Sequence, residues 1–177
     1  GGSTGEPVKF YIDRHTVEYY EAARYRGLSW WDVNIGDRCA MIWGSPIELN
    51  SNKNIIYKLK ERYLKNRILI PAYNLKQESI DEYIRKMNDF KPEYIYGYAS
   101  ALHIYSKMML DNGYFIDNPP KTVVSTAETL YPAQRETIET AFNAPVVNEY
   151  GARDGGILAY ECSHHSMHIS MENAYIE

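Results

Sequence analysis

The stretch Lys121–Gly156 reads KTVVSTAETLYPAQRETIETAFNAPVVNEYGARDGG, and its pattern decides the fold. Thr122–Thr126 is a short β-branched run, which is typical of a buried strand. Pro132 suits the first turn of a helix, where a missing N–H costs little. The apolar residues that follow recur at helical spacing among charged residues: Ile138, Ala141 and Phe142. Val146-Val147 then begins a second strand, so the stretch is predicted to be a βαβ unit.

Each strand of this unit is followed by a polar turn. The first turn is Thr126-Ala127-Glu128, and the second runs from Asn148 to Asp154. In open α/β sheets, ligands bind outside the carboxyl ends of the strands. We therefore expect the two turns to face one crevice.

The rest of the chain alternates strands and helices in the same way. Helices are predicted over His15–Arg26, Asn52–Lys65, Ser79–Phe90 and Ser100–Asn112. Strands are predicted over Val8–Ile12, Arg38–Trp43, Arg67–Tyr73, Glu93–Tyr98, Ile157–Glu161 and His168–Ile176. This alternation indicates an α/β fold with a largely parallel sheet and helices on both faces, plus a small β segment around a Cys/His turn. At 177 residues, a single domain over 1–177 is expected.

Composition narrows the function classes. The net charge of −4 argues against a nucleic-acid partner, because phosphate binding usually needs a basic face. Cys39 and Cys162 are too few for a disulfide framework, which favours a reducing, cytoplasmic location. No apolar run approaches the roughly 20 residues needed to cross a bilayer, so no membrane span is predicted.

Three motifs carry a resemblance to a known superfamily. Asn148-x-Tyr150-Gly151-x-x-Asp154 resembles the N-x-Y-G-x-T-E signature of adenylate-forming enzymes, the acyl-CoA synthetase and luciferase superfamily. Ala127-Glu128 resembles the G-A-E turn of the branch that contains phenylacetate–CoA ligases and related capsular-polysaccharide-biosynthesis proteins. The first residues, Gly2 to Pro7, resemble the S-G-[ST]-T-G-x-P phosphate loop. All three occur in the family's order and roughly at its spacing, so the resemblance covers essentially the whole chain.

The resemblance implies a nucleotide site for ATP and AMP. In the family the aromatic residue at Tyr150 stacks on adenine, the amide at Asn148 reads its exocyclic amine, and Gly151 lets the backbone turn close to the nucleotide. A flat ring with an amide that offers donor and acceptor is chemically a sensible purine reader. The predicted loop residues that wrap the triphosphate are Gly2, Ser3, Thr4 and Gly5, with Ala127 and Glu128 beside the nucleotide.

Two positions of the signature depart from the family. Asp154 stands in place of the Glu that binds Mg²⁺, and a shorter carboxylate can still hold Mg²⁺ through oxygen. Arg153 stands in place of a phosphate-binding Thr or Ser, and a guanidinium can bond phosphate more strongly. The loop departs too, since Val8 follows the Pro where the family often has Lys. Arg153 and Asp154 are the predicted catalytic residues.

The resemblance also assigns the substrate side. In relatives the end of the strand before the Ser100 helix lines the acyl pocket, which implies substrate-binding roles for Tyr98, Ala99 and Ser100. The family's reaction joins a carboxylic acid to ATP as an acyl-adenylate and then transfers the acyl group to a thiol, usually coenzyme A. The chain is expected to be an excised part of the N-terminal domain of such a ligase. Because the family's C-terminal domain and its Lys are absent, the piece is expected to be inactive alone.

The segment Cys162-Ser163-His164-His165-Ser166-Met167-His168 contains four potential metal ligands. Thiolate and imidazole are ligands that Zn²⁺ prefers. The family branch often has C-x-C-x-x-x-H here, so the resemblance implies a structural zinc on Cys162, His164 and His168. No fourth ligand is evident nearby.

Each assignment has an alternative. Tyr150 can be a core aromatic, Glu128 a solvated turn carboxylate, and Ser100 a helix cap. The whole chain can be a nucleotide-binding or interaction module that has lost catalysis. A third interpretation is a hydrolase that uses Ser3 in a G-x-S-x-G elbow, but an extended segment rather than a helix follows that motif. A Walker loop is excluded because no Gly-Lys-[Ser/Thr] follows at the required spacing. The sequence leaves the acid and the oligomeric state open.

Overall fold

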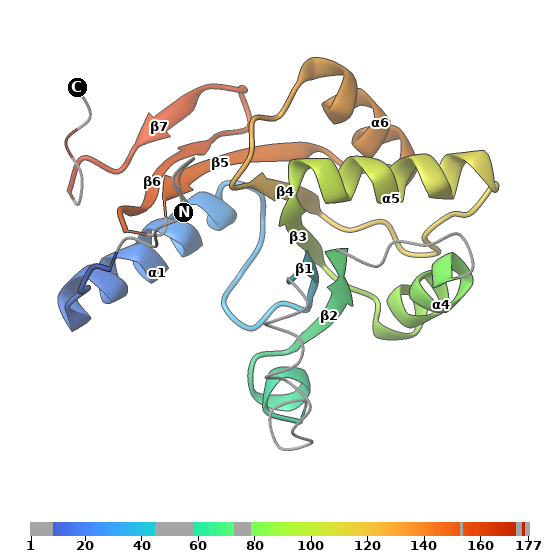
Figure 1. Ribbon diagram of the computed structural model, residues 1–177, viewed down its shortest axis with the longest axis horizontal. Helices are drawn as coiled ribbons and strands as arrows, with labels where there is room; N and C mark the ends of the chain where they lie inside the picture. The colour runs from blue at the N-terminus through green and yellow to red at the C-terminus, as the bar shows by residue number, and fades with distance from the viewer. Residues whose placement is uncertain (1–8, 45–58, 73–78, 153, 173–174, 176–177) are drawn as a thin grey trace.

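The structure is a computed structural model that describes residues 9–44, 59–72, 79–152, 154–172 and 175 (Figure 1). The predicted phosphate loop Gly2–Gly5 and the predicted catalytic Arg153 lie outside these residues. The first half of the predicted helix Asn52–Lys65 lies outside them as well, and its end is a short π-helix, η1, over Lys60–Leu64.

The described strands form one seven-stranded sheet in the order β2-β1-β3-β4-β5-β6-β7. Its first five strands are parallel, and β6 and β7 pair antiparallel with their neighbours. The bounds are β1 Cys39–Trp43, β2 Arg67–Pro71, β3 Tyr94–Tyr98, β4 Thr122–Thr126, β5 Val146–Ala152, β6 Gly156–Glu161 and β7 Met167–Ile169. The predicted α/β class, with a largely parallel sheet and a small β segment at the Cys/His turn, is confirmed.

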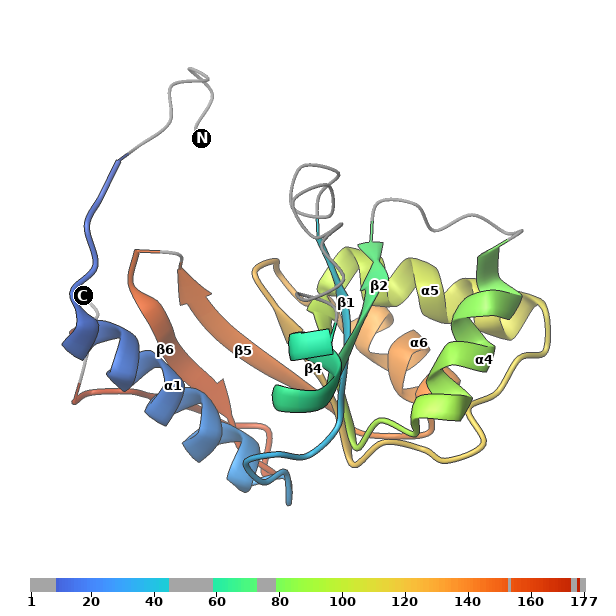
Figure 2. The ribbon, with the colours of Figure 1, turned by 90° about the horizontal axis from the view of Figure 1, so that it is seen from below.

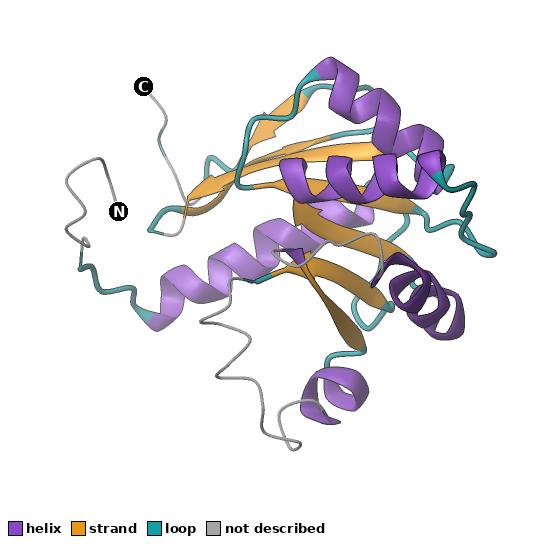
Figure 3. Ribbon diagram, turned by 45° about the vertical axis from the view of Figure 1, so that its right-hand side comes forward, coloured by secondary structure: helices purple, strands orange, loops and turns teal. Residues whose placement is uncertain are grey.

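Helices cover both faces of this sheet, as predicted (Figures 2 and 3). One face carries α4 (Ile80–Phe90), α5 (Ala99–Asp111) and α6 (Pro132–Phe142), and the other carries α1 (Arg14–Ser29). None of the helices in the described part of the chain is long and apolar enough to cross a membrane.

Side chains alternate between the two faces of the sheet along each strand, so the strands contribute to two hydrophobic cores. Ile95, Val123 and Val146 face α4–α6, whereas Tyr96, Val124 and Val147 face α1. Successive strand residues point to opposite sides of the sheet, so a strand covered on both faces must be apolar throughout. All five residues of β4 are buried, which explains why this run is β-branched without alternation.

The structure corrects several predicted element bounds. The predicted last strand, His168–Ile176, ends at Ile169 as β7. Residues 9–12, in the predicted first strand, are not in a strand. β5 continues through Ala152 where a turn was predicted after Val147, because antiparallel pairing with β6 gives these polar residues strand partners. The predicted helix His15–Arg26 runs from Arg14 to Ser29 as α1, and its N-cap is Asp13, whose carboxylate accepts the Thr16 N–H at 2.7 Å. An Asp at this position satisfies a backbone donor that the helix leaves unpaired.

Candidate functional site at the carboxyl edge of the sheet

The predicted site segments meet at the carboxyl ends of the parallel strands. Thr126, the last residue of β4, pairs with Glu149 of β5, so the turn after β4 lies beside Tyr150. The Ser100 N–H, in the first turn of α5, donates to the Glu128 carboxylate at 2.7 Å. The turns after β3 and β4 are therefore joined directly, and the expected common edge is formed.

Glu128 thus has a partner, although its side chain is exposed. A carboxylate at the N-terminus of a helix is favoured by the helix dipole. Ala127 beside it has φ of +65°, a left-handed conformation that costs a non-glycine residue energy. Such strain at a turn beside a cleft is typical of functional sites.

The three predicted substrate-binding residues at the end of β3 differ in exposure. Ala99 is fully buried, and Ser100 is exposed. Tyr98 is half-buried, and its ring stacks on Trp43 with ring centroids 4.1 Å apart. Trp43 is not among the predicted site residues, although an aromatic residue at the carboxyl end of a parallel strand is itself a signal for this edge.

Tyr150 and Asn148 differ in exposure. The Tyr150 side chain is 56% exposed, so it is available to a stacking partner and is not the core aromatic of the alternative interpretation. Asn148 is half-buried, and its backbone N–H donates to the Glu161 carboxylate at 2.7 Å.

Gly151 has a structural role of its own. A Cβ at this position would lie 2.5 Å from the Gly156 carbonyl oxygen, where the β5–β6 pairing is irregular. The close approach of β6 therefore requires glycine here with or without a nucleotide.

Asp154 lies in the turn between β5 and β6. Its carboxylate is exposed and accepts the Gly155 N–H at 3.1 Å. The Tyr20 hydroxyl of α1 donates to the Asp154 carbonyl at 2.7 Å, which fixes this turn against the helix.

A cleft of about 1090 Å³ opens beside this edge, over the sheet face that α1 covers only in part. Its upper lining includes Trp43, Tyr98, Thr126, Ala127 and Gly151. Deeper in the cleft, the Glu149 carboxylate accepts hydrogen bonds from the Tyr96 hydroxyl and, at 2.8 Å, from the Thr126 hydroxyl.

Glu149 is only 2% exposed, and burial raises the pKa of its carboxyl. Its second oxygen, Oε2, has no protein partner among the described residues. Sequence analysis missed this residue because Asn148 to Asp154 was assigned to a turn. In a strand, the position after Val147 and Asn148 points inward with Val147.

The predicted zinc site is not supported. No three His, Cys, Asp or Glu side chains in the described ranges are grouped so that they could hold a metal ion. His168 packs edge-on against Trp30, with ring centroids 5.2 Å apart, and His165 Nδ1 lies 3.0 Å from Glu161. Of the three predicted ligands, Cys162 and His164 interact: the backbone N–H groups of His164 and Ser166, together with the His164 side chain, lower the pKa of the Cys162 thiol.

No family model matches the chain. A 2-hydroxyisobutyryl-CoA ligase, solved in complex with 2-HIB-AMP and CoA, is similar with a TM-score of 0.61 and 16% identity over 89% of this chain and 37% of its own. VinN in complex with L-aspartate has a TM-score of 0.63 and 13% identity over 93% of this chain and 38% of its own. The luciferase-like enzyme of the mealworm Zophobas morio has a TM-score of 0.53 and 12% identity, covering 84% and 32%.

The fold is therefore one that adenylate-forming CoA ligases and luciferase-like enzymes share, and the predicted resemblance is confirmed at that level. Among curated proteins, the chain is similar to Protein CapK of Staphylococcus aureus, with 27% identity over 186 residues. The alignment covers 100% of this chain and 39% of CapK. The chain thus spans about two fifths of the length of its curated relative.

Proposed function

We propose that residues 1–177 form part of the N-terminal, adenylate-binding domain of a longer ligase. The ligase activates a carboxylic acid with ATP, giving an acyl-adenylate and pyrophosphate, and then transfers the acyl group to a thiol such as coenzyme A. Three kinds of support agree: the ordered motifs, the fold shared with solved CoA ligases, and the similarity to CapK. The phenylacetate–CoA ligase-like and capsular-polysaccharide branch is part of the proposal, and so is a cytoplasmic location.

The observation that carries the proposal is the exposed Tyr150 ring at the carboxyl edge, beside the Ala127-Glu128 turn. A ring left uncovered next to a strained turn can take one face of a purine. In this arrangement Tyr150 stacks on adenine and the Asn148 amide reads its amine. Gly2, Ser3, Thr4, Gly5 and Arg153 are assigned to the phosphates from the sequence.

Mg²⁺ fits the donor chemistry at Asp154. This ion is commonly held by one or two carboxylates, with the remaining positions filled by phosphate oxygens and water. The exposed Asp154 carboxylate supplies one such oxygen, in a turn that Tyr20 holds in place. A bound Mg²⁺ would neutralise phosphate charge, and no zinc is included in the proposal because the Cys/His turn does not fit one.

The acid is assigned to the adjoining cleft. Tyr98 and Ala99 lie where β3 ends, Ser100 follows them, and Trp43 closes the same side. The parallel-strand edge lets these residues hold the carboxylate near the nucleotide phosphates. The adenylation step then needs mainly orientation and electrostatic stabilisation.

A second candidate is a non-catalytic nucleotide-binding module on the same fold. Arg153 and Asp154, both departures from the family signature, favour it. Carboxylate-dependent exchange of pyrophosphate into ATP by the full-length protein separates the two. We expect exchange with at least one member of a panel of aryl, alkyl and amino acids. Nucleotide binding without exchange for any member would favour the module, and the absence of both would contradict the proposed function.

A further inference from the structure

The first half of β5 is held on its outer edge by side chains instead of a strand. β6 ends at Glu161 and pairs with β5 only from Glu149 onward. Backbone groups of Val146 and Asn148 on this edge would otherwise lack a ladder partner. A buried backbone group without a partner is costly, so the chain must satisfy them in another way.

Three side chains, here called the edge network, supply the partners: Arg135 and Glu139 of α6, and Glu161 of β6. Glu139 accepts the Val146 N–H at 3.0 Å, and Arg135 donates to the Val146 carbonyl. Glu161 accepts the Asn148 N–H at 2.7 Å.

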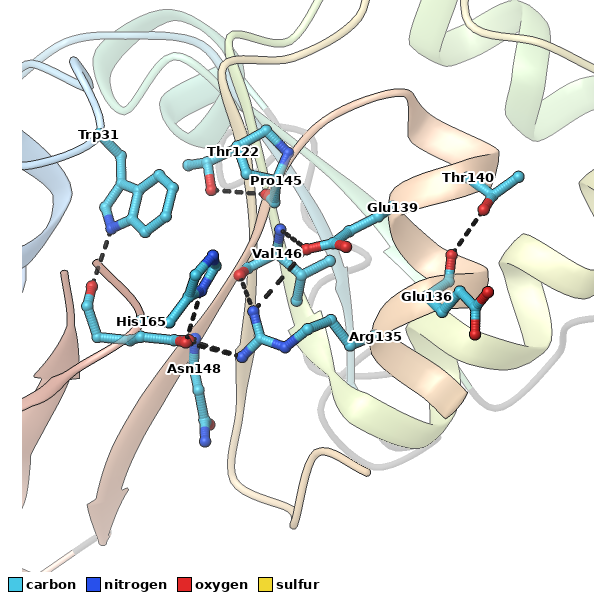
Figure 4. A network of polar contacts seen from close by, with 11 residues as sticks. Trp31, Thr122, Arg135, Glu136, Glu139, Thr140, Pro145, Val146, Asn148 and His165 are labelled. Atoms are coloured by element: carbon cyan, nitrogen blue, oxygen red, sulfur yellow. Dashed lines mark hydrogen bonds and ion pairs between the residues drawn. The ribbon is translucent and has the colours of Figure 1, made fainter. Parts of the chain in front are cut away.

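The edge network is itself tightly connected. Arg135 Nη2 donates to both carboxylate oxygens of Glu161, at 3.0 and 2.7 Å, while Arg135 Nη1 donates to the Val146 carbonyl. Glu161 is 4% exposed, and His165 Nδ1 lies 3.0 Å from it. Figure 4 shows Arg135, His165 and the Asn148 backbone converging on one carboxylate.

We propose that the ion pair between Arg135 and the buried Glu161 is a positioning device for Asn148, and through it for base selectivity at the nucleotide site. This inference rests on the proposed function. Asn148 is the residue at which side-chain bonding replaces the β5–β6 ladder, so its orientation depends on Glu161. The Asn148 N–H donates a charge-assisted bond to a carboxylate that Arg135 holds in place, which leaves the Asn148 backbone little freedom.

The test is selectivity for AMP over GMP in the full-length protein. Calorimetric titration gives the dissociation constant of each nucleotide, and selectivity is the dissociation constant of GMP divided by that of AMP. A loss of folded protein lowers the apparent amount of binding sites for both nucleotides equally and leaves the ratio of their dissociation constants unchanged. We expect Glu161→Gln to lower this ratio by about fivefold or more, the lower end of what a bidentate amide–base contact contributes. Arg135→Lys keeps the charge but cannot bond Glu161 and the Val146 carbonyl with two separate nitrogens, and it should lower the ratio less.

Asp37→Asn is the matched control. Asp37 is also a half-buried carboxylate in an ion pair, 2.7 Å from Lys121, but it lies in the loop before β1, at the opposite edge of the sheet. It should reduce stability without changing the ratio. Circular dichroism at the titration temperature selects variants that are folded.

The double variant Glu161→Gln/Asn148→Ala completes the test. If Glu161 acts through Asn148, this variant should be no less selective than Asn148→Ala alone. Wild-type selectivity in folded Glu161→Gln and Arg135→Lys would overturn the positioning role while leaving the nucleotide site intact. A wild-type protein that binds AMP and GMP equally would instead overturn the adenine assignment, and the positioning role with it.

Discussion

Tyr150 is the residue on which the nucleotide assignment depends. Replacing it with alanine removes the exposed ring and should weaken AMP binding by about 1–3 kcal/mol, the range measured for base–aromatic stacking. Titration of AMP into the full-length protein measures this. Tyr63→Ala is the control, because Tyr63 is another exposed ring that lies on η1, away from the carboxyl edge. Equal affinities in folded Tyr150→Ala and wild type would remove Tyr150 from the site.

Glu149 gives a prediction about pH. Burial raises the pKa of its carboxyl in the folded state above the usual value of 4.5. The folded protein therefore favours the protonated form, and the stability that this form contributes is present below about pH 4.5 and is lost as pH rises through the folded-state pKa. Glu149→Gln removes the ionisation and keeps the acceptor oxygen for Tyr96 and Thr126.

We expect the stability advantage of Glu149→Gln over wild type, measured by urea unfolding, to grow as the pH rises from 4 to 8. A constant difference over this range would show that Glu149 does not titrate differently in the folded and unfolded states.

The two cysteines should differ in reactivity. Cys39 is buried, which raises the pKa of its thiol to about 12, whereas backbone N–H groups lower the pKa of the half-exposed Cys162 thiol. Since the thiolate is the nucleophile, iodoacetamide should modify Cys162 in the native protein and Cys39 only after unfolding. Mass spectrometry identifies the modified residue.

The same reaction tests the zinc correction. We expect the rate at Cys162 to be equal with and without a chelator. Protection of Cys162 that a chelator removes would restore the zinc prediction.

At the scale of elements, α1 fixes the β5–β6 turn through a close contact. A Cβ at Gly156 would lie 1.9 Å from the Tyr20 ring, and Gly156 has φ of +68°. Gly113, after α5, has nearly the same φ of +67°, and a Cβ there would meet nothing within 4 Å. The two glycines thus have nearly the same positive φ but differ in their steric surroundings.

Gly113→Ala should therefore cost about 1–2 kcal/mol of unfolding free energy, which is the cost of a left-handed backbone conformation for alanine without any steric clash. Gly156→Ala should cost more and should also weaken Mg²⁺-dependent nucleotide binding, because it displaces Tyr20 from the turn that contains Asp154. Thermal and urea unfolding give the two costs. Equal costs would contradict the close packing of α1 on this turn.

The sequence predicts well those helices and strands whose bounds are set by residues close together in the chain. The strand Thr122–Thr126 was predicted with the bounds it has, because a β-branched run between turn residues has few other solutions. α4 was predicted from Ser79 and begins at Ile80. β5 was predicted too short, because the strand character of Asn148–Ala152 comes from pairing with β6, which no local pattern reports.

The same limit applies to the site. Tyr150, Ala127 and Glu128 were predicted from motifs, and the order of parallel strands brings them to one edge. The edge network was missed, since Arg135, Glu139 and Glu161 are separated in sequence and each one alone looks like a solvated charge. Glu149 was missed because its burial depends on α1 and on Tyr96 of another strand.

On the scale of the whole molecule, one sheet separates two environments. The α4–α6 face is a continuous apolar core, whereas the α1 face contains the cleft and the buried groups of Arg24, Tyr96 and Glu149. Of the predicted nucleotide residues, Ala127 and Gly151 line that cleft, and Tyr150 lies at the same carboxyl edge of the sheet. In the proposed function, this edge holds the nucleotide and the adjoining cleft takes the carboxylic acid.

The central claim is that an adenosine nucleotide binds at this edge. The most direct measurement is a crystal structure of the full-length protein with AMP. We predict the adenine ring against the Tyr150 side chain, with the Asn148 amide at its exocyclic amine and the phosphate toward Asp154. AMP bound elsewhere, with the Tyr150 ring uncovered, would contradict the account.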